Sequence, residues 1–283
     1  MHGAPEMRGG ANEPMADVTL ADLIGTVSPS RIETALQCMA RFHWQYVEKT
    51  PRPFRADQQL GNAVDATATW LYERKRKTRR NPKILDVLEF FASQWDYERQ
   101  AIDDWQGDTP VGLQRMGLGM VKAWFEQVAC NVQPEATQQH ITRNVVDVDS
   151  KVEFLLTGVI DAIGRTTVPR AVIDVKQSVR AYREDRVLRS SQPPTYTLLA
   201  GVDVFEFHVL VRNVEPRVQV LRTVVTDADR QSFIRRTAML RRQIAHAWKS
   251  GDWLPNRTGF LCSRRYCAHW DACERRFGGT VPN

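Results

Sequence analysis

Apolar residues recur at helical spacing near the start of the chain. Ser28 followed by Pro29 is typical of a helix start, because serine accepts hydrogen bonds from free backbone N–H groups and proline loses no bond at the first helical position. The apolar residues that follow are three or four positions apart and predict one helix to about Val47, namely Ile32, Leu36, Met39, Phe42 and Tyr46. Pro51 and Pro53 lie beyond its end.

Three more helices are expected before residue 136. The first, over residues 57–80, ends in the basic run Arg74 to Arg80. We interpret this run as a solvated helix end, because cations suit a helix C-terminus, and a phosphate-facing patch is the alternative. The segments 85–105 and 111–132 have aromatic residues at helical spacing. Core packing accounts for both, and Cys130 is predicted to be a small buried residue.

From about residue 136 the pattern changes to alternation, and β-branched residues become frequent, which is typical of strands. We expect strands in the segments 140–148, 151–163, 170–176, 204–212 and 217–225, with a short helix at 195–200. A long helix over 227–248 should bury Phe233, Leu240, Ile244 and Trp248 and turn Arg235, Arg236, Arg241 and Arg242 to its other face. The whole pattern predicts an α/β fold with a small mixed sheet flanked by helices.

Composition places the chain among ordinary globular proteins, since 42% of its residues are hydrophobic and 25% are charged. No apolar run approaches the roughly 20 residues that cross a bilayer, and the first 26 residues lack the apolar stretch of a signal peptide, so a cytoplasmic protein with no membrane partner is expected. The formal net charge of +6 favours an anionic partner such as nucleic acid.

Two aspartates and a lysine form a candidate metal site. Asp161 lies near the end of one predicted strand, and Asp174 and Lys176 lie two positions apart on the next. Alternate residues of a strand share a face, and an antiparallel neighbour could bring Asp161 beside them. An Asp-x-Lys pair is often only a surface ion pair. Here, however, the pair is on the apolar segment 171–175, where unpaired charge would be costly.

Such a pair of carboxylates suits Mg²⁺ or Mn²⁺, which prefer oxygen ligands and leave room for water and a phosphate group. The ion would activate a water molecule and neutralise charge that develops during phosphodiester hydrolysis. The lysine beside it could orient or deprotonate that water. The constellation therefore indicates a metal-dependent nuclease.

Three of the five cysteines, Cys262, Cys267 and Cys273, lie close together near the C-terminus beside several aromatic residues. Without an export signal, metal or cluster ligation is favoured over disulfides. The gaps of four and five residues are longer than the two-residue gaps typical of structural zinc sites, which favours an iron-sulfur cluster. Zinc remains the alternative. Cys38, which flanks the apolar stripe of the first helix, is the candidate fourth ligand.

These motifs, in this order, resemble the PD-(D/E)xK nuclease superfamily, and within it the RecB-like branch that includes the CRISPR-associated four-cysteine exonucleases and their phage relatives. The resemblance rests on Ser28 to Arg31 with Cys38, Gly61 to Asp65, Gly158 to Asp161, Asp174 to Lys176, Gln192 to Tyr196, and the last three cysteines. The branch normally has a histidine where this chain has Asp65.

The resemblance implies a role for each of these residues. Asp161, Asp174, the Val175 carbonyl and Asp65 would hold Mg²⁺ or Mn²⁺, and Lys176 would be the catalytic lysine. Gln192 and Tyr196 would help to hold Lys176 and the DNA. Cys38, Cys262, Cys267 and Cys273 would bind a structural 4Fe-4S cluster.

The expected organisation is a flexible N-terminus over residues 1–27, a helical region over 28–135, a nuclease core over 136–250 and a cysteine-rich segment over 251–283 that packs back on residues 28–48. The resemblance to this branch also implies exonucleolytic cleavage of DNA at single strands or ends. An inactive DNA-binding protein of the same fold, with a zinc or iron-sulfur site, is the alternative, and a homo-oligomer is left open.

Overall fold

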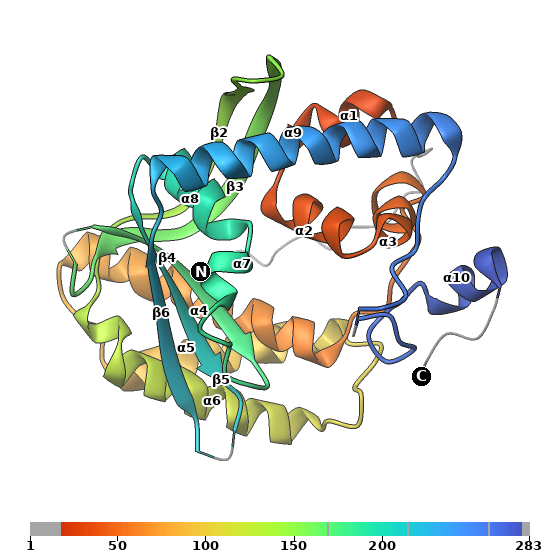
Figure 1. Ribbon diagram of the computed structural model, residues 1–283. Coiled ribbons are helices and arrows are strands. Elements are labelled where there is room, and N and C mark those ends of the chain that lie inside the picture. The colour runs from red at the N-terminus through yellow and green to blue at the C-terminus, as the bar shows by residue number, and fades with distance from the viewer. Residues whose placement is uncertain (1–17, 169, 214, 260, 279–283) are drawn as a thin grey trace, which may run out of the picture.

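A computed structural model of the chain describes residues 18–168, 170–213, 215–259 and 261–278. Its centre is a mixed sheet, which confirms the α/β fold class (Figure 1). The strands are β1 (Thr26–Val27), β2 (Gln133–Asp147), β3 (Val152–Arg165), β4 (Ala171–Ser178), β5 (Val204–Val211) and β6 (Arg217–Val224). Strand β4 is parallel to β5 and antiparallel to β3, and β6 is antiparallel to β5.

Strand β3 has three partners. It pairs with β2 along its whole length, from Val152 to Arg165. Strands β1 and β4 must therefore share its other edge, where β1 pairs at Leu155 and Leu156 and β4 pairs from Ala162 to Gly164. Among the described residues, the stretch of β3 between these two partners, residues 157–161, has no strand beside it on that edge. This opening positions the candidate site.

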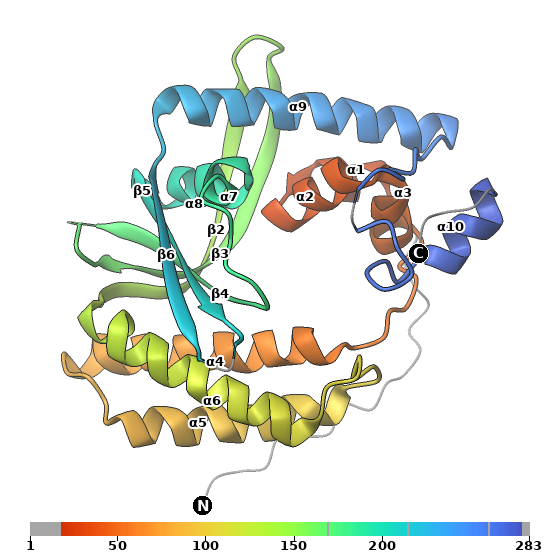
Figure 2. The same ribbon diagram turned by 60° about the horizontal axis from the view of Figure 1, so that its bottom comes forward.

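One face of the sheet is covered by α4 (Ala56–Thr78), α5 (Ile84–Glu98) and α6 (Pro110–Gln127), the lower layer in Figure 2. Their apolar faces bury large side chains together with the sheet residues Ile173, Val175 and Leu210. Two short 3₁₀ segments, Arg99–Ala101 and Ala129–Asn131, follow α5 and α6.

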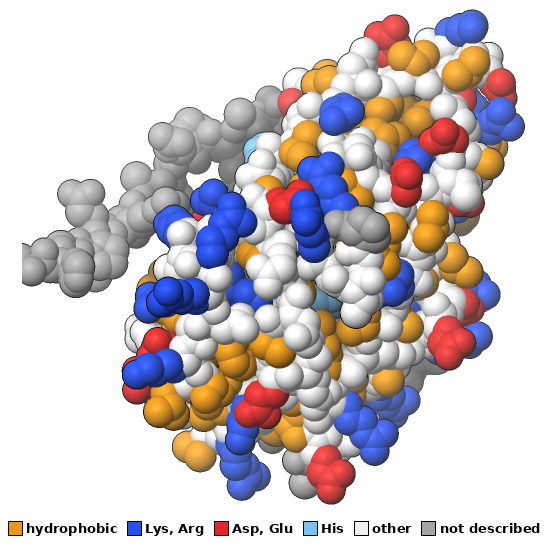
Figure 3. Space-filling view, turned by 90° about the vertical axis from the view of Figure 1, so that its left-hand side faces the viewer, with side chains coloured by type: hydrophobic (Ala, Val, Ile, Leu, Met, Phe, Trp, Pro, Cys, Tyr) orange, Lys and Arg blue, Asp and Glu red, His pale blue; other side chains and the backbone are white. Residues whose placement is uncertain are grey.

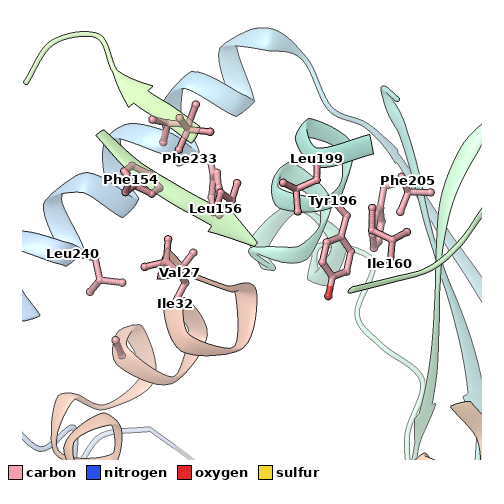
Figure 4. Packing of buried hydrophobic residues seen from close by; sticks show 14 of the residues in the cluster. Val27, Ile32, Phe154, Leu156, Ile160, Tyr196, Leu199, Phe205, Phe233 and Leu240 are labelled. Atoms are coloured by element: carbon pink, nitrogen blue, oxygen red, sulfur yellow. The ribbon is translucent and has the colours of Figure 1, made fainter. Parts of the chain in front are cut away.

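The other face of the sheet is covered by α8 (Gln192–Ala200), α9 (Asp227–Ser250) and the N-terminal helices (Figure 2). Their side chains form a second apolar cluster, in which Ile32, Phe154, Leu156, Leu199 and Phe233 are buried (Figure 4). The residues expected to form one helical region over 28–135 thus cover both faces of the sheet.

The single helix expected from Ser28 to Val47 is wrong. The chain forms α2 (Pro29–Gln37), α3 (Met39–Phe42) and a π-helical turn, His43–Val47. Cys38 between them has extended backbone angles, with φ −169° and ψ 115°. Its sulfur accepts a hydrogen bond from the Arg41 backbone N–H at 3.4 Å, so Cys38 starts the new helix. Ser28 has the backbone of an N-cap residue but no capping side-chain bond.

The expected flexible N-terminus over residues 1–27 is wrong for its last ten residues, 18–27, which are ordered into a short helix and β1. Residues 1–17 lie outside the described residues. Beyond them the chain forms α1 (Leu20–Ile24), which begins at a capping box between Thr19 and Asp22, and then β1. Leu23 and Val27 are buried, and their apolar contacts hold this segment against the sheet and α9.

The structure contradicts the expected burial of three side chains: Arg241 and Lys75 were expected to face solvent, and Cys130 was expected to be buried. Arg241 of α9 is buried rather than on the solvated face, and it donates hydrogen bonds to the carbonyls of Ile24 and Glu153. Lys75 is buried, unlike the solvated helix end expected for its basic run, and it donates hydrogen bonds to the carbonyls of Ala129 and Cys130 at 2.6 and 3.0 Å. The Cys130 side chain is half-buried, because it follows the end of α6.

The remaining elements are α7 (Arg186–Arg189), just before α8, and α10 (Trp270–Phe277). Within the described part of the chain, no helix is both long and apolar enough to cross a membrane. Basic side chains are scattered among acidic and apolar ones on the face shown in Figure 3. On that face the net positive charge of the chain is not gathered into one patch.

Candidate active site and cysteine cavity

The pairing of β3 with β4 brings the two aspartates together. Ala162 pairs with Ile173, so Asp161 and Asp174 are the next two residues beyond the last pair. There the strands stop pairing, and the Asp161 carboxylate accepts the Val175 backbone N–H at 2.9 Å. The Asp161 carboxylate thus replaces the backbone carbonyl that would accept this N–H in a regular strand pair. β3 and β4 are antiparallel neighbours, as expected.

Asp174 and Lys176 share one face of β4, as strand alternation predicts. Lys176 Nζ lies 2.5 Å from Asp174 Oδ2. Asp174 is almost fully buried, with 1% of its side chain exposed, whereas the Lys176 side chain is 33% exposed. Solvent therefore reaches the pair from the lysine side.

Helix α8 contributes two further predicted residues. Gln192 Nε2 donates a hydrogen bond to Asp174 Oδ1 at 3.0 Å and lies 3.4 Å from the Tyr196 hydroxyl oxygen. The two prolines after Gln192 therefore do not separate it from Tyr196, because both prolines fit the first turn of α8. The Tyr196 ring packs beside Ile160 and Leu199, and its hydroxyl points out of the apolar cluster (Figure 4).

The close approach of Tyr196 depends on Gly158. A Cβ atom at this glycine would lie 2.6 Å from Tyr196 Cε1. Gly158→Ala should therefore displace Tyr196 and destabilise the fold by about 1–3 kcal/mol through overpacking. We expect a lower melting temperature together with roughly tenfold slower cleavage, because Tyr196 and Gln192 share one hydrogen bond.

Melting curves and cleavage rates of the two proteins would check this. Gly61→Ala in α4 is the stability control. Its Cβ would lie 3.7 Å from the Gln177 side chain, which is an ordinary van der Waals distance. A Gly158→Ala protein as stable and active as wild type would contradict the packing argument.

Asp65 of α4 is affected by the charges of Asp161 and Lys176. Although Asp65 is an exposed residue, burial of its carboxyl group and the nearby charge of Asp161 raise its pKa to about 6, against the opposing effect of Lys176. Asp65, Asp161 and Lys176 thus act on one another electrostatically. In the described part of the chain, Asp161 directly contacts the β4 backbone and Asp174 directly contacts Lys176, whereas Asp65 is linked to them only through the effect of their charges on its pKa.

The pKa values of Asp161 and Asp174 are also raised, and burial is the largest cause for both. Burial and the charge of Asp161 raise the pKa of Asp174 to about 7, although Lys176 opposes the shift. Burial likewise raises the pKa of Asp161, against the effects of Lys176 and the Val175 N–H. Burial alone would lower the pKa of Lys176, but Asp174 and Asp161 outweigh it and raise the pKa above its ordinary value. Lys176 therefore stays protonated.

No three of the histidine, cysteine, aspartate and glutamate side chains in the described ranges lie close enough together to form a metal-binding group. Chemically, however, the carboxylates fit a divalent cation. Three acidic side chains with raised pKa values face one lysine, so the site has unbalanced negative charge when all three are ionised. A hard cation would offset that charge, and oxygen ligands are those it prefers.

The raised pKa values predict that metal binding strengthens as pH rises. Without metal, a carboxyl whose folded pKa exceeds its unfolded value of 3.8 costs stability progressively from about pH 4 to its folded pKa, near 6 for Asp65 and 7 for Asp174. A metal ion displaces those protons. The rise in melting temperature caused by Mn²⁺ should therefore be small at about pH 5 and larger at about pH 8. A rise that is equal at both values would contradict this.

Sequence patterns missed several residues around the site. The buried Tyr72 hydroxyl has no hydrogen-bond partner among the described residues, and its pKa is raised by burial and then by Asp161 and Glu206. Glu206 is itself buried and lies 3.0 Å from His208. These residues fall on apolar strands and helices, where polar residues could equally have faced solvent, so no sequence signal distinguished them.

Glu33 of α2 is another residue that the sequence did not single out. Its Oε1 accepts the Ser191 backbone N–H at 3.1 Å and lies 2.8 and 3.0 Å from the hydroxyls of Ser190 and Ser191. Gln192 follows directly, so Glu33 fixes the start of α8 and, through it, the side chain that contacts Asp174. Partners 157 and 158 positions apart carry no local sequence signal.

Four of the five cysteines line one cavity of about 410 Å³ between α2, α3 and the C-terminal segment, namely Cys38, Cys262, Cys267 and Cys273. Cys130 is not among its lining residues. The C-terminal segment contacts the N-terminal helices here, since Asn256 donates to the Gln37 carbonyl at 2.9 Å and the ring of Trp253 packs beside Phe42 and His43.

Among the described residues, no three of these cysteines lie close enough together to form a metal-binding group, but cysteine is the residue type whose thiol binds soft metals and clusters. Burial raises the pKa values of Cys262, Cys267 and Cys273, and the neighbouring cysteine sulfurs raise them further. Such thiols need a cation before they ionise. Cys38 Sγ also accepts the backbone N–H groups of Arg41 and Asn256, both at 3.4 Å, and hydrogen bonds of this kind support cluster sulfurs.

A family model for the PD-(D/E)XK nuclease superfamily matches residues 26–274 of the chain. A search of curated proteins found no match. Among solved structures, the crystal structure of SSO0001 is 14% identical with a TM-score of 0.40, and the match covers 89% of this chain and 87% of that one. A structure from Eubacterium rectale, named "Putative exonuclease", is 12% identical with a TM-score of 0.45, and 97% of each chain is covered.

Proposed function

The chain belongs to the PD-(D/E)XK nuclease superfamily, and from this premise we propose that it is a Mg²⁺- or Mn²⁺-dependent deoxyribonuclease that degrades DNA from single strands or ends. The observation that carries the proposal is the meeting of Asp161, Asp174 and Lys176 where β3 and β4 separate. One third of the Lys176 side chain is exposed, so a phosphate group could contact the lysine from solvent.

Asp161, Asp174 and Asp65 would hold the divalent ion, together with the Val175 carbonyl. When bound, the ion would supply an activated water molecule and neutralise charge on the phosphate group. The chain's own groups prepare the site for this. Gln192 fixes one oxygen of Asp174 at 3.0 Å, and Lys176 lies 2.5 Å from the other, which leaves the Asp161 and Asp65 carboxylates to complete the site.

With no metal bound, Asp174 and Asp161 raise the pKa of Lys176 above its ordinary value. As a cation, Lys176 can orient the attacking water and stabilise negative charge at the phosphate. Tyr196 also stays protonated, because burial and then Asp174 raise its pKa to about 12. Its hydroxyl can therefore donate a hydrogen bond to a phosphate oxygen.

The proposal includes a structural 4Fe-4S cluster held by Cys38, Cys262, Cys267 and Cys273. It is supported by the shared cavity and by the backbone N–H groups directed at Cys38 Sγ. The cluster would join α2 and α3 to the C-terminal segment, where few aliphatic side chains pack. Zinc is the other ion that a set of four thiolates holds, and colour separates the two, since an iron-sulfur protein purified without air is brown.

The test is degradation of end-labelled single- and double-stranded DNA with Mg²⁺ or Mn²⁺, comparing wild type with Asp174→Ala and Lys176→Ala. We expect wild type to shorten the single strand progressively and both variants to leave it intact. Equal inactivity of the three proteins, with DNA binding retained, would replace the proposal with an inactive DNA-binding protein in which Asp65 fails as a ligand.

A further inference from the structure

A second opening lies beside the candidate catalytic residues. This cavity, of about 380 Å³, is lined by Gln192 and Tyr196 on one side and by Ser28, Ser30, His140 and Thr157 on the others. It occupies the gap on the β3 edge between β1 and β4. Because Gln192 also contacts Asp174, whatever fills the cavity lies next to the site where cleavage would occur.

Polar side chains from β2 and β3 form one wall of the cavity. His140 Nε2 lies 3.1 Å from Thr157 Oγ1, and Thr142 Oγ1 lies 2.8 Å from the same atom. His140 faces Val159 across the two strands, and Val159 is 46% exposed. An imidazole beside an exposed aliphatic side chain forms a small flat surface, of the kind on which nucleic-acid bases stack.

The opposite wall is formed by the start of α2. Ser28 and Ser30 present hydroxyl groups 3.1 Å apart, and neither caps the helix. One carboxylate, Glu33, also lines the cavity. Its Oε1 accepts hydrogen bonds from Ser190 and Ser191, which hold the carboxylate on the α8 side of the cavity. The remaining polar groups can donate hydrogen bonds to phosphate or sugar oxygens.

The cavity continues past Thr157. A neighbouring cavity, of about 410 Å³, shares the lining residues Ser28 and Thr157 with the cavity described above and extends to Thr26 and Arg31. Asp22 lies at its edge, but this carboxylate is held by the Thr19 backbone N–H and hydroxyl. Together the two openings form a narrow polar path that leads to Gln192, which we call the β3-edge groove.

From this geometry we infer that the β3-edge groove binds the single-stranded nucleic acid next to the cleaved phosphate, with a base on His140 and Val159 and its sugar-phosphate backbone along Ser28, Ser30 and Thr157. The inference rests on the proposed function, because it places the substrate of that same site. The cavity that would hold the base, of about 380 Å³, is near the lower end of the roughly 300–1,000 Å³ of small-ligand sites, which suits one nucleotide and not a duplex.

Binding of a fluorescent 12-nucleotide thymidine strand by the full-length protein, in buffer without Mg²⁺, tests the inference. His140→Ala should weaken binding about tenfold, since one base–aromatic stacking contact contributes roughly that factor. His140 is exposed, so the variant should fold as wild type does. His246→Ala, which removes an exposed histidine of α9 that does not line the groove, should bind as wild type does.

A cleavage assay with Mg²⁺ separates this inference from the proposed function. If wild type cleaves, His140→Ala should raise KM about tenfold and leave kcat nearly unchanged, because it loses substrate contact and no reacting group. Active wild type with unchanged binding and KM in His140→Ala overturns the groove and leaves the nuclease proposal standing. Inactive wild type with weakened strand binding in His140→Ala overturns the nuclease proposal and supports the groove.

Discussion

Asp174→Asn is expected to slow DNA cleavage by about a thousandfold, because it removes one negative charge from the centre of the site and keeps the shape of the side chain. The introduced amide could still accept the Gln192 hydrogen bond through its oxygen. It could not offset the charge of Lys176, which lies 2.5 Å from Oδ2 in wild type, and it would bind a divalent cation weakly. The loss should therefore appear in kcat as well as in metal affinity.

Rates with saturating Mn²⁺ on a labelled single strand would measure this effect. Asp227→Asn is a matched control, because Asp227 is 95% exposed at the start of α9 and pairs only with Arg230 among the described side chains. Melting curves should show that both variants remain folded. Cleavage by Asp174→Asn within about tenfold of wild type would remove Asp174 from the proposed chemistry.

Cys273→Ala should cause the largest loss of stability. Cys273 is buried against Ala40 and Trp44 and lines the cavity with three other cysteines. Losing the proposed cluster, which would join two distant segments, should remove about 5 kcal/mol or more, which lowers the melting temperature of a domain of this size by roughly 10 °C. Iron, sulfide and the brown colour should be lost with it.

Cys130→Ala is the matched control for that prediction. Cys130 contacts the carbonyl of Glu126 at 3.3 Å and does not line the cavity, so this variant should bind the proposed cluster as wild type does and melt near the wild-type temperature. If Cys273→Ala and Cys130→Ala melt alike and neither protein contains iron or zinc, the cavity has no metal role.

The strands and the active-site pairing could be predicted because they follow from local patterns. Alternation identified β3 and β4, and two residues of separation put Asp174 and Lys176 on one face. The antiparallel register that places Asp161 beyond Ala162 then follows from a short connection between the strands. Gln192 and Tyr196, in contrast, are assigned only by the family resemblance, and the prolines between them argue against a shared face; they meet because both prolines fit the first turn of α8.

The remaining features depend on contacts between distant segments. Apolar periodicity continues through Cys38, so the break between α2 and α3 could not be seen, and only the packing of Asn256 and Arg41 around Cys38 accounts for it. The buried place of Arg241 likewise depends on the carbonyls of Ile24 and Glu153, far away in sequence. Helical spacing predicts which face is apolar, but it does not predict which neighbour covers that face.

A crystal structure of the protein with Mn²⁺ and a short thymidine strand tests the central claim most directly, because the anomalous signal of manganese locates the ion. The account predicts one peak about 2.0–2.3 Å from carboxylate oxygens of Asp161 and Asp174, beside Lys176 and a phosphate group. A peak elsewhere, or none in a protein that still cleaves DNA, would contradict it.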